Sequence, residues 1–328
     1  MRILLTGGTG FLGRRVAARL ASAGHSLRLL VRGTGPRAGL PDGVETLSGD
    51  VTDAVGFARA AEGCEAIFHT AALVKSWVPD PAAFDTINVG GVRNALAAAR
   101  SAGARLVYTS SFMAIGPTGA EPVDESRLHP GTYRNDYERT KAMADQLARE
   151  AAAAGQDVVV LYPGVIYGPG ELTDGNLVVK MLADHLCGRF PGYVGTGEKL
   201  WSYSFVEDVA EGHLLALSKG QTGERYFLCG DNAPMTRLFA LVEEITGVAA
   251  PRRHIPLGLA ASLGRLMMLW ADLTGLPPKL THETVNVFRE HWAYSSGRAE
   301  RELGYRMTPL AEGLRKTIDW LKAEGHVG

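Results

Sequence analysis

Three glycines near the N-terminus constrain the fold of this chain more than any other feature. Gly7, Gly10 and Gly13 follow a short apolar segment over residues 2–5 and open a helical pattern over residues 10–23. Glycines at this spacing allow a tight turn between a strand and a helix, and they let backbone N–H groups approach a pyrophosphate. The helix N-terminus adds partial positive charge there. The segment therefore predicts a dinucleotide-binding turn, with an ordinary strand-to-helix turn as the alternative.

Strands and helices continue to alternate through the first half of the chain. Apolar runs predict strands at residues 26–32, 46–49, 66–69, 105–110 and 157–162, and helical periodicity appears at residues 89–102 and 137–154. Strands separated by helices of this length predict parallel β-α-β units with right-handed crossovers. The nearly continuous apolar strand at residues 157–162 predicts a sheet covered on both faces. We therefore expect an α/β fold with a doubly wound, parallel, Rossmann-like sheet.

The pattern changes after Pro163. Glycine and proline cluster at residues 164–175 and again at 191–197, and a helical pattern returns at residues 205–216. The domain boundaries that we predict use these changes. A dinucleotide-binding domain covers residues 1–163 and is completed by about residues 205–232, and a smaller, mostly helical substrate-binding lobe is formed by residues 164–204 and 233–328.

Composition narrows the range of partners. The chain has 34 basic and 35 acidic residues without a basic block, which argues against a nucleic-acid partner. Cys64, Cys187 and Cys229 are far apart, which predicts reduced thiols in a cytoplasmic protein and no metal site. The apolar stretch at residues 255–271 contains glycines and Arg265, so we expect no integral membrane segment. For residues 254–273 we favour a core or dimer-contact helix over a membrane-surface or lid helix.

The end of the second predicted strand bears on the choice of dinucleotide. Arg32 stands there, and the next carboxylate in the chain is Asp42. An arginine at this place suits a 2′-phosphate, whereas an acidic residue would bind a free 2′-hydroxyl. Arg32 therefore favours NADP(H), with Arg14 or Arg15 as helpers. NAD(H) stays open, because Arg32 could instead stack on the adenine or lie in solvent.

Further cofactor contacts are predicted at the ends of the first, third and fourth strands. Asp50 is placed to accept a hydrogen bond from an adenine amino group, although a turn or helix cap explains it equally well. Small residues after the fourth strand leave room for the cofactor. The contacts expected from these segments are Gly7, Thr9, Gly10, Phe11, Leu12, Gly13, Arg32, Asp50, Val51, Thr70, Ala71 and Ala72.

A tyrosine and a lysine one helical turn apart suggest proton-transfer chemistry. Tyr137 and Lys141 share one face of the predicted helix. An ammonium group near a phenol favours the phenolate, which lets the tyrosine exchange a proton with an alcohol or a carbonyl. Ser111, or alternatively Ser110, ends a predicted strand and could hydrogen-bond the reacting oxygen. Asn88 could hold a proton-relay water, with a helix cap as the alternative.

These motifs together resemble the extended short-chain dehydrogenase/reductase family. The matching segments are TGGTGFLG (Thr6–Gly13), GDVTD (Gly49–Asp53), HTAA (His69–Ala72), NVGG (Asn88–Gly91), YTSS (Tyr108–Ser111), YERTK (Tyr137–Lys141) and YPGVIYGPG (Tyr162–Gly170). The resemblance implies a Rossmann-like domain that binds NAD or NADP and a Ser–Tyr–Lys catalytic set in which Tyr137 and Lys141 also contact the cofactor. It also implies that Pro163, Gly164 and Val165 line the nicotinamide, and that the chain forms a homodimer.

Within this family the chain looks most like the farnesol dehydrogenase-like and dihydroflavonol reductase-like branch. Residues 71–84 and 190–213 carry much of that likeness. Two features stand apart from it. Tyr162 occupies a place where many relatives carry arginine, and farnesol dehydrogenases of this type are associated with NAD, which conflicts with the prediction from Arg32.

The sequence thus predicts an alcohol dehydrogenase or carbonyl reductase for an apolar small molecule of isoprenoid or aromatic type. Apolar residues expected near the substrate are Val74, Trp77, Phe112, Met113, Ile166, Tyr193 and Trp201. One alternative is a nucleotide-sugar epimerase or dehydratase, which needs cations for a second diphosphate. Another is a sensor that binds NADP(H) without catalysis, against which the intact Ser111, Tyr137 and Lys141 argue.

Overall fold

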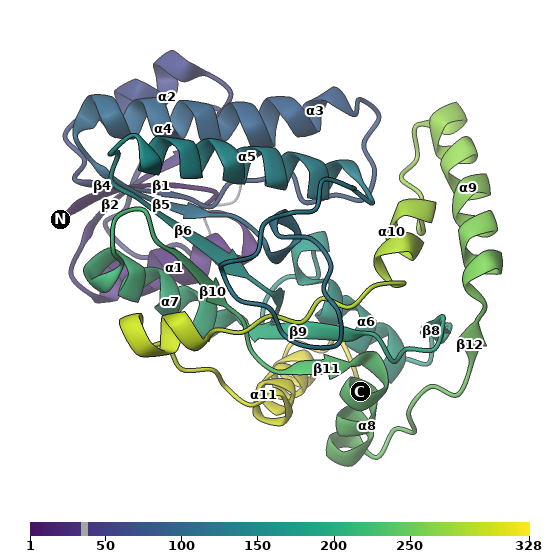
Figure 1. Cartoon of the computed structure of the whole chain (residues 1–328). Coiled ribbons are helices and arrows are strands. Elements are labelled where there is room, and N and C mark those ends of the chain that lie inside the picture. Colours follow the sequence, from purple (N-terminus) through teal and green to yellow (C-terminus); the bar gives the residue numbers. More distant parts are fainter. Residues whose placement is uncertain (34–38) are drawn as a thin grey trace.

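A computed structural model describes residues 1–33 and 39–328 and is organised around one parallel sheet (Figure 1). The sheet has the strand order β10-β6-β5-β4-β1-β2-β3. Its strands are β1 (Arg2–Thr6), β2 (Ser26–Val31), β3 (Glu45–Ser48), β4 (Ala66–His69), β5 (Arg105–Thr109), β6 (Val158–Pro163) and β10 (Arg225–Leu228). The order reverses between β1 and β4, which creates a crevice at the carboxyl ends of these two strands.

Helices cover both faces of the sheet. Figure 1 shows α1 and α7 on one face and α2, α4 and α5 on the other. Their bounds are α1 (Phe11–Ser22), α7 (Val206–Lys219), α2 (Ala54–Ala61), α4 (Gly91–Ala102) and α5 (Asp136–Ala153). The predicted doubly wound, Rossmann-like α/β fold is therefore confirmed. The strands of its centre are apolar on both sides because both sides are covered, and Val158 to Leu161 are almost fully buried.

The helix predicted from residue 89 starts earlier than its periodicity indicates. A short helix α3 (Ala82–Phe84) leads into a π-helical turn over Asp85–Gly90, which runs directly into α4. Asn88 therefore lies inside the helix and does not cap it. A π-helical turn holds one more residue than an α-helical turn, and such turns are frequent at functional sites.

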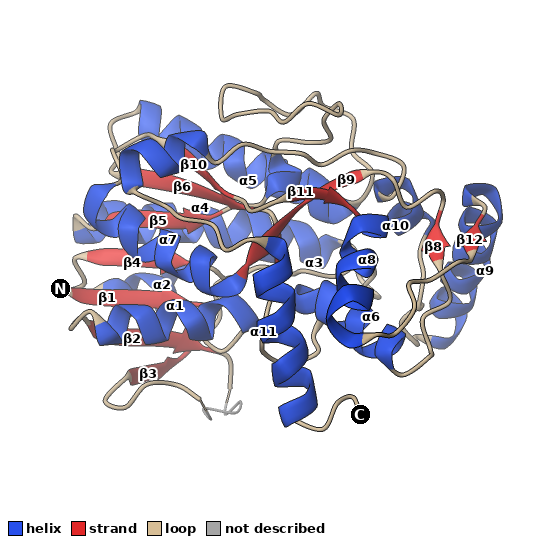
Figure 2. Cartoon of the chain, turned by 90° about the horizontal axis from the view of Figure 1, so that it is seen from below, coloured by secondary structure: helices blue, strands red, loops and turns tan. Residues whose placement is uncertain are grey.

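The C-terminal region and residues 164–204 build a second layer beside the carboxyl ends of the strands (Figure 2). A three-stranded sheet of β7 (Val165–Tyr167), β9 (Leu200–Phe205) and β11 (Asn232–Pro234) lies at its centre. The helices α6 (Leu177–Leu186), α8 (Met235–Thr246) and α11 (Leu310–Ala323) belong to this layer. Short 3-10 turns at Phe112–Ala114 and Asp174–Asn176 and a π-helical turn at Ala299–Leu303 complete the connections.

One part of this layer stands apart from the sheet. The two-stranded pair β8 (Tyr193–Val194) and β12 (His254–Ile255) leads to α9 (Leu257–Thr274), which packs against α10 (His282–Val287). The expectation of a core helix here is not met, because the large side chains of α9 face solvent. Among the described residues, none of the helices is long and apolar enough to span a bilayer.

Candidate active site

The glycine loop is packed so tightly that side chains are excluded from it. Gly7 has a left-handed φ of 74°, and a Cβ there would lie 2.7 Å from the backbone N of Ala71. A Cβ on Gly13 would collide with the carbonyl oxygen of Gly7. Gly10 caps α1 without a side-chain acceptor, so the first N–H groups of the helix point at the crevice without a side-chain partner. This cradle fits the pyrophosphate of a dinucleotide.

Below this loop the buried polar groups are neutral and mostly paired. Thr6 Oγ1 lies 2.9 Å from His69 Nδ1, and Thr70 Oγ1 donates to the Thr6 carbonyl over 2.7 Å. Burial, with a smaller effect of the Lys141 charge, lowers the pKa of His69 to about 3. His69 is therefore uncharged at neutral pH and adds no positive charge below the loop, whereas the N-terminus of α1 contributes partial positive charge to it.

Several residues were predicted to select the cofactor. Some of them form hydrogen bonds with other groups of the protein. Arg14 donates to the Thr9 carbonyl at 2.9 Å, and Arg15 donates to the Pro169 carbonyl at 2.8 Å. Arg32 follows β2 directly and is exposed. Asp50 accepts hydrogen bonds from the backbone N and the hydroxyl of Thr52 at 2.9 and 2.8 Å. These bonds are typical of the turn that was the alternative to an adenine contact. The role of Asp50 at the adenine stays a prediction.

The serine and the tyrosine of the predicted catalytic set meet at the carboxyl end of β5. Ser111 begins the 3-10 turn after β5, and its hydroxyl accepts from the Met113 backbone N at 3.2 Å. Asn135 caps α5 by accepting from the Glu138 backbone N at 2.7 Å, which places Tyr137 in the first turn of the helix. Burial raises the pKa of Tyr137, and a hydrogen bond with Ser111 opposes that rise. The phenol is therefore protonated at neutral pH.

Lys141 lies one turn further along α5 and is buried. Its Nζ donates to the Thr109 carbonyl at 2.9 Å and to the Tyr108 hydroxyl at 3.2 Å, and it lies 4.9 Å from the centre of the Tyr108 ring. Burial lowers the pKa of Lys141 to about 7, and the carboxylate of Asp145 opposes that change. Small changes around this ammonium group therefore alter its charge near neutral pH.

Sequence reasoning missed Tyr108 and Asp145 as neighbours of Lys141. Asp145 is buried on the same face of α5, one turn beyond Lys141, and accepts hydrogen bonds from the Tyr162 hydroxyl at 2.6 Å and from Arg149 Nε at 2.9 Å. The i, i+4 spacing from Lys141 was the available signal for Asp145. Tyr162, which differs from many relatives, thus serves as a neutral partner of this carboxylate.

Asn88 holds the chain segment that follows β4. Its side-chain oxygen accepts from the Leu73 backbone N at 2.7 Å, and its amide donates to the Leu73 carbonyl at 3.3 Å and to Thr140 Oγ1 at 3.1 Å. The side chain therefore connects this loop to α5 beside Tyr137. Whether its backbone also holds a relay water stays a prediction.

A small apolar hollow of about 20 Å³, room for about one water molecule, is lined in part by Val165. Of the residues expected near the substrate, Trp201 lines it, and the centre of its ring lies 5.2 Å from the centre of the tilted Phe288 ring. Sequence reasoning missed the remaining lining residues, Leu177, Val178, Met181, Tyr203, Met235, Leu238 and Phe288. Their spacing on helices resembles that of ordinary core residues, so periodicity gave no separate signal.

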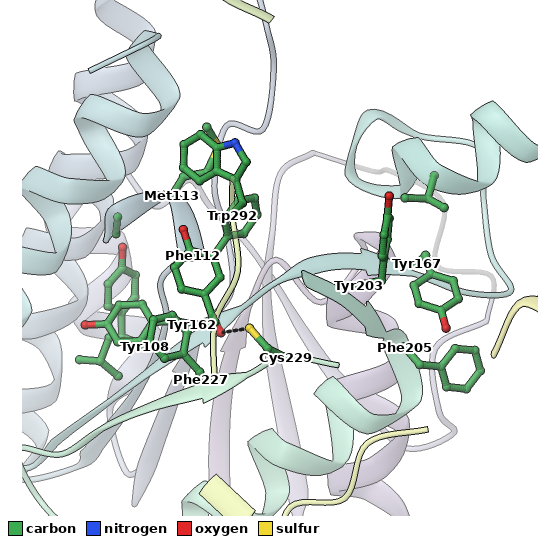
Figure 3. Close-up of a cluster of buried hydrophobic side chains, with 14 of the residues drawn as sticks. Tyr108, Phe112, Met113, Tyr162, Tyr167, Tyr203, Phe205, Phe227, Cys229 and Trp292 are labelled. Atoms are coloured by element: carbon green, nitrogen blue, oxygen red, sulfur yellow. Dashed lines mark hydrogen bonds between the residues drawn. The ribbon is translucent and has the colours of Figure 1, made fainter. Parts of the chain in front are cut away.

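The other residues expected near the substrate are dispersed. Phe112 and Met113 are buried in the aromatic cluster that Figure 3 shows, where the Phe112 ring lies 5.5 Å from Trp292. Tyr193 packs on Phe239 at 5.8 Å. Ile166 packs against the apolar core on the far side of the sheet, Val74 is exposed, and Trp77 donates to Asp272 at 3.3 Å. Their role at the substrate stays a prediction.

Three of the six cations that a second diphosphate would need are held by partners within the protein. Arg189 pairs with Asp184 at 3.0 Å, and Arg237 pairs with Glu244 at 3.0 Å. Arg225 donates to the Glu125 carbonyl. Three of the six candidates named by the sequence, Lys180, Arg189, Arg225, Arg237, Arg252 and Arg253, thus have partners away from the crevice.

Comparison with known proteins identifies one family. The model of the NAD dependent epimerase/dehydratase family matches residues 3–229. A putative dihydroflavonol 4-reductase of Synechocystis is 33% identical over 98% of this chain and 95% of its own length. A 2-alkyl-3-oxoalkanoate reductase of Stenotrophomonas maltophilia is 32% identical over 96% of this chain and 98% of its own. The crystal structure of gox2253 superposes with a TM-score of 0.83 at 32% identity and covers 99% of both chains.

Proposed function

This chain belongs to the NAD-dependent epimerase/dehydratase family, the extended short-chain dehydrogenases/reductases, and from that premise we propose that it reduces the carbonyl group of an apolar small molecule or oxidises the matching alcohol. The observation that supports this proposal most is that the apolar hollow begins at Val165, just after β6, while Ser111 follows the neighbouring parallel strand β5, so both lie at the same carboxyl edge of the sheet. A site of this kind orients a substrate with a few polar groups and holds the rest by apolar contact. The names of the similar reductases support the same reading.

The proposed roles follow from the geometry of the polar end. Ser111 and Tyr137 hydrogen-bond the reacting oxygen, and Tyr137 donates a proton to it during reduction or accepts one during oxidation. The raised pKa of Tyr137 keeps its phenol protonated, which suits the reduction direction. When it is bound, the nicotinamide would be the hydride donor in reduction and the hydride acceptor in oxidation. Pro163, Gly164 and Val165 would border the nicotinamide, and the Lys141 ammonium would bind the ribose beside it and lower the pKa of Tyr137.

We propose NADP(H) as the preferred cofactor, on the grounds that the exposed Arg32 directly follows β2. The family as a whole is NAD-dependent, so the test must compare both cofactors. Arg32→Glu introduces a carboxylate that repels a 2′-phosphate. We expect it to raise the KM for NADPH at least tenfold while that for NADH falls or stays unchanged. Equal use of NADH by the unchanged protein would contradict the proposal.

The activity test measures oxidation of NADPH and NADH with farnesal and with aromatic aldehydes and ketones. UDP-sugars are incubated with the protein and NAD, and their products are separated by chromatography, because epimerase and dehydratase reactions consume no net NAD(P)H. Turnover of the apolar carbonyl compounds is the expected result. Turnover of UDP-sugars alone would assign the chain to the epimerase or dehydratase reaction, against which the pairing of Arg189 and Arg237 with carboxylates argues. Tight NADPH binding without turnover of any compound would assign it to a sensor. Light scattering tests the homodimer that the family resemblance implies.

A further inference from the structure

Helix α9 presents a stripe of large apolar side chains to solvent. Leu259, Leu263, Leu266, Trp270 and Leu273 recur at alternating spacings of four and three residues, so they lie along one face. These side chains are 44 to 83% exposed. Leu269 and Leu276 are also exposed. A continuous exposed apolar face of this size marks an interaction site.

The buried face of α9 has the opposite character. It consists of the small residues Ala260, Ala261, Gly264 and Ala271, and a Cβ on Gly264 would lie 2.7 Å from the backbone N of His282. The helix thus lies close against the start of α10 through its small residues and turns its large residues outward. This is the reverse of a helix that packs on a protein core. Both cartoon views place α9 at the margin of the molecule, away from the large sheet (Figures 1 and 2).

The charges around the stripe are mainly positive. Residues 252–279 contain four cations and a single carboxylate. Arg252 and Arg253 precede the helix, Arg265 lies on its flank and Lys279 follows its end, and all four are exposed. The carboxylate, Asp272, accepts a hydrogen bond from Trp77 Nε1. The apolar stripe is therefore bracketed by cations at both of its ends.

This charge pattern distinguishes between the candidate occupants of the face. In a parallel pair of two α9 helices, each cationic end would meet the same cationic end of the other copy. In an antiparallel pair, Arg252 and Arg253 of one copy would meet Lys279 of the other. Both arrangements place like charges together, which is unfavourable. An anionic lipid surface instead satisfies the apolar stripe and the cations at once.

We propose that α9 lies in the interface of an anionic lipid bilayer, with its stripe among the acyl chains and its flanking cations at the headgroups. Trp270 would then lie at the boundary that tryptophan side chains favour. Docking at this place brings the bilayer beside the active site. Trp77, which contacts α9, belongs to the segment after β4 that Asn88 holds at Leu73. Capture of an apolar substrate from the bilayer would rest on the proposed function, whereas docking itself does not.

The test is flotation of the full chain with vesicles of phosphatidylcholine alone and of phosphatidylcholine with phosphatidylglycerol. We expect binding to the anionic vesicles that weakens as salt rises, because salt screens the cations. The double variant Leu266→Gln/Leu273→Gln should bind at least about tenfold more weakly, because it removes two apolar side chains from the interface. The control Val55→Gln/Leu128→Gln changes two exposed apolar residues elsewhere and should bind like the unchanged chain.

Tryptophan emission, light scattering and turnover complete the test. Tryptophan emission should shift to shorter wavelength with anionic vesicles, and Trp270→Phe should remove most of that shift. The proposal is overturned if the unchanged chain does not float, if the stripe variant floats as well as the control, or if light scattering shows a dimer that Leu266→Gln dissociates. Turnover of a short, water-soluble ketone should be alike in both double variants. Docking without turnover of any carbonyl would contradict the proposed function alone, and turnover without docking would contradict this inference alone.

Discussion

The polar and apolar ends of the candidate site are built in different ways. At the polar end, Ser111, Tyr137 and Lys141 are fixed by backbone and side-chain hydrogen bonds within two elements, the end of β5 and the start of α5. At the apolar end, the hollow is lined from α6, β9, α8 and the segment after α10. The first is set by short sequence motifs and the second by tertiary packing. Chemistry and substrate choice should therefore respond separately to mutation.

The largest effect should come from the polar end. Tyr137→Phe removes the hydroxyl that exchanges the proton, and we expect kcat to fall by about 10³-fold. Cofactor affinity, measured by fluorescence titration, should change less than twofold, because the glycine loop is untouched. Ser111→Ala, which removes the proposed hydrogen bond from Ser111 to the reacting oxygen, is the companion variant. Full activity of Tyr137→Phe would contradict the proposed proton transfer by Tyr137.

An intermediate effect should come from the apolar end. Met181→Trp places a bulkier indole side chain in the hollow, and we expect the KM for long-chain carbonyl compounds to rise about tenfold, because their apolar contacts are lost. The KM for short-chain compounds should stay within a factor of two. Met143→Trp, on an exposed part of α5, is the matched control. An equal loss for short and long substrates would mean that the two ends are not separate.

The buried ammonium group gives the polar end a measurable cost in stability. The unfolded chain keeps its lysine protons to about pH 10, whereas folding lowers the pKa of Lys141 to about 7. Between these values the unfolded state binds more protons, so the free energy of unfolding should rise with pH by at most about 1.4 kcal/mol per unit. Below pH 7 the penalty is complete. The free energy of unfolding, measured with urea at several pH values, should rise more steeply with pH for the unchanged chain than for Lys141→Met. Parallel plots of this free energy against pH would contradict the prediction.

The smallest effect should come from Asp145, which acts on Lys141 at a distance. Its carboxylate raises the Lys141 pKa, so Asp145→Asn should move the Lys141 titration to lower pH, by about half a unit. The pH profile of kcat/KM measures this shift, and Asp184→Asn, in a surface ion pair, is the control. A profile that does not move, with activity simply lowered, would indicate a purely structural role for Asp145.

The same contrast explains how far the sequence predicts this molecule. The glycine loop, most of the alternation of strands and helices and the Tyr137–Lys141 spacing depend on neighbours in the chain, so periodicity and motif spacing predicted the named elements within about three residues, although α2 and β10 were not predicted. The hollow depends on Phe288 meeting Trp201 across 87 positions of sequence, and no local pattern encodes such a meeting. Asn88 shows that prediction is limited even within a motif. It lies in a π-helical turn and its side chain binds Leu73, whereas a helix cap was the predicted alternative.

That π-helical turn also has a consequence for how the chain tolerates changes in length. Over Asp85–Gly90 one extra residue is accommodated within a single turn, while α4 continues undisturbed behind it. Removing one residue at position 86 or 87 would therefore convert this turn into a regular α-helical turn and keep the segments on either side of it in phase. A deletion within the regular part of α4 would instead rotate the residues before it by about 100° relative to those after it. A single-residue deletion is thus expected to be tolerated better in this turn than in α4.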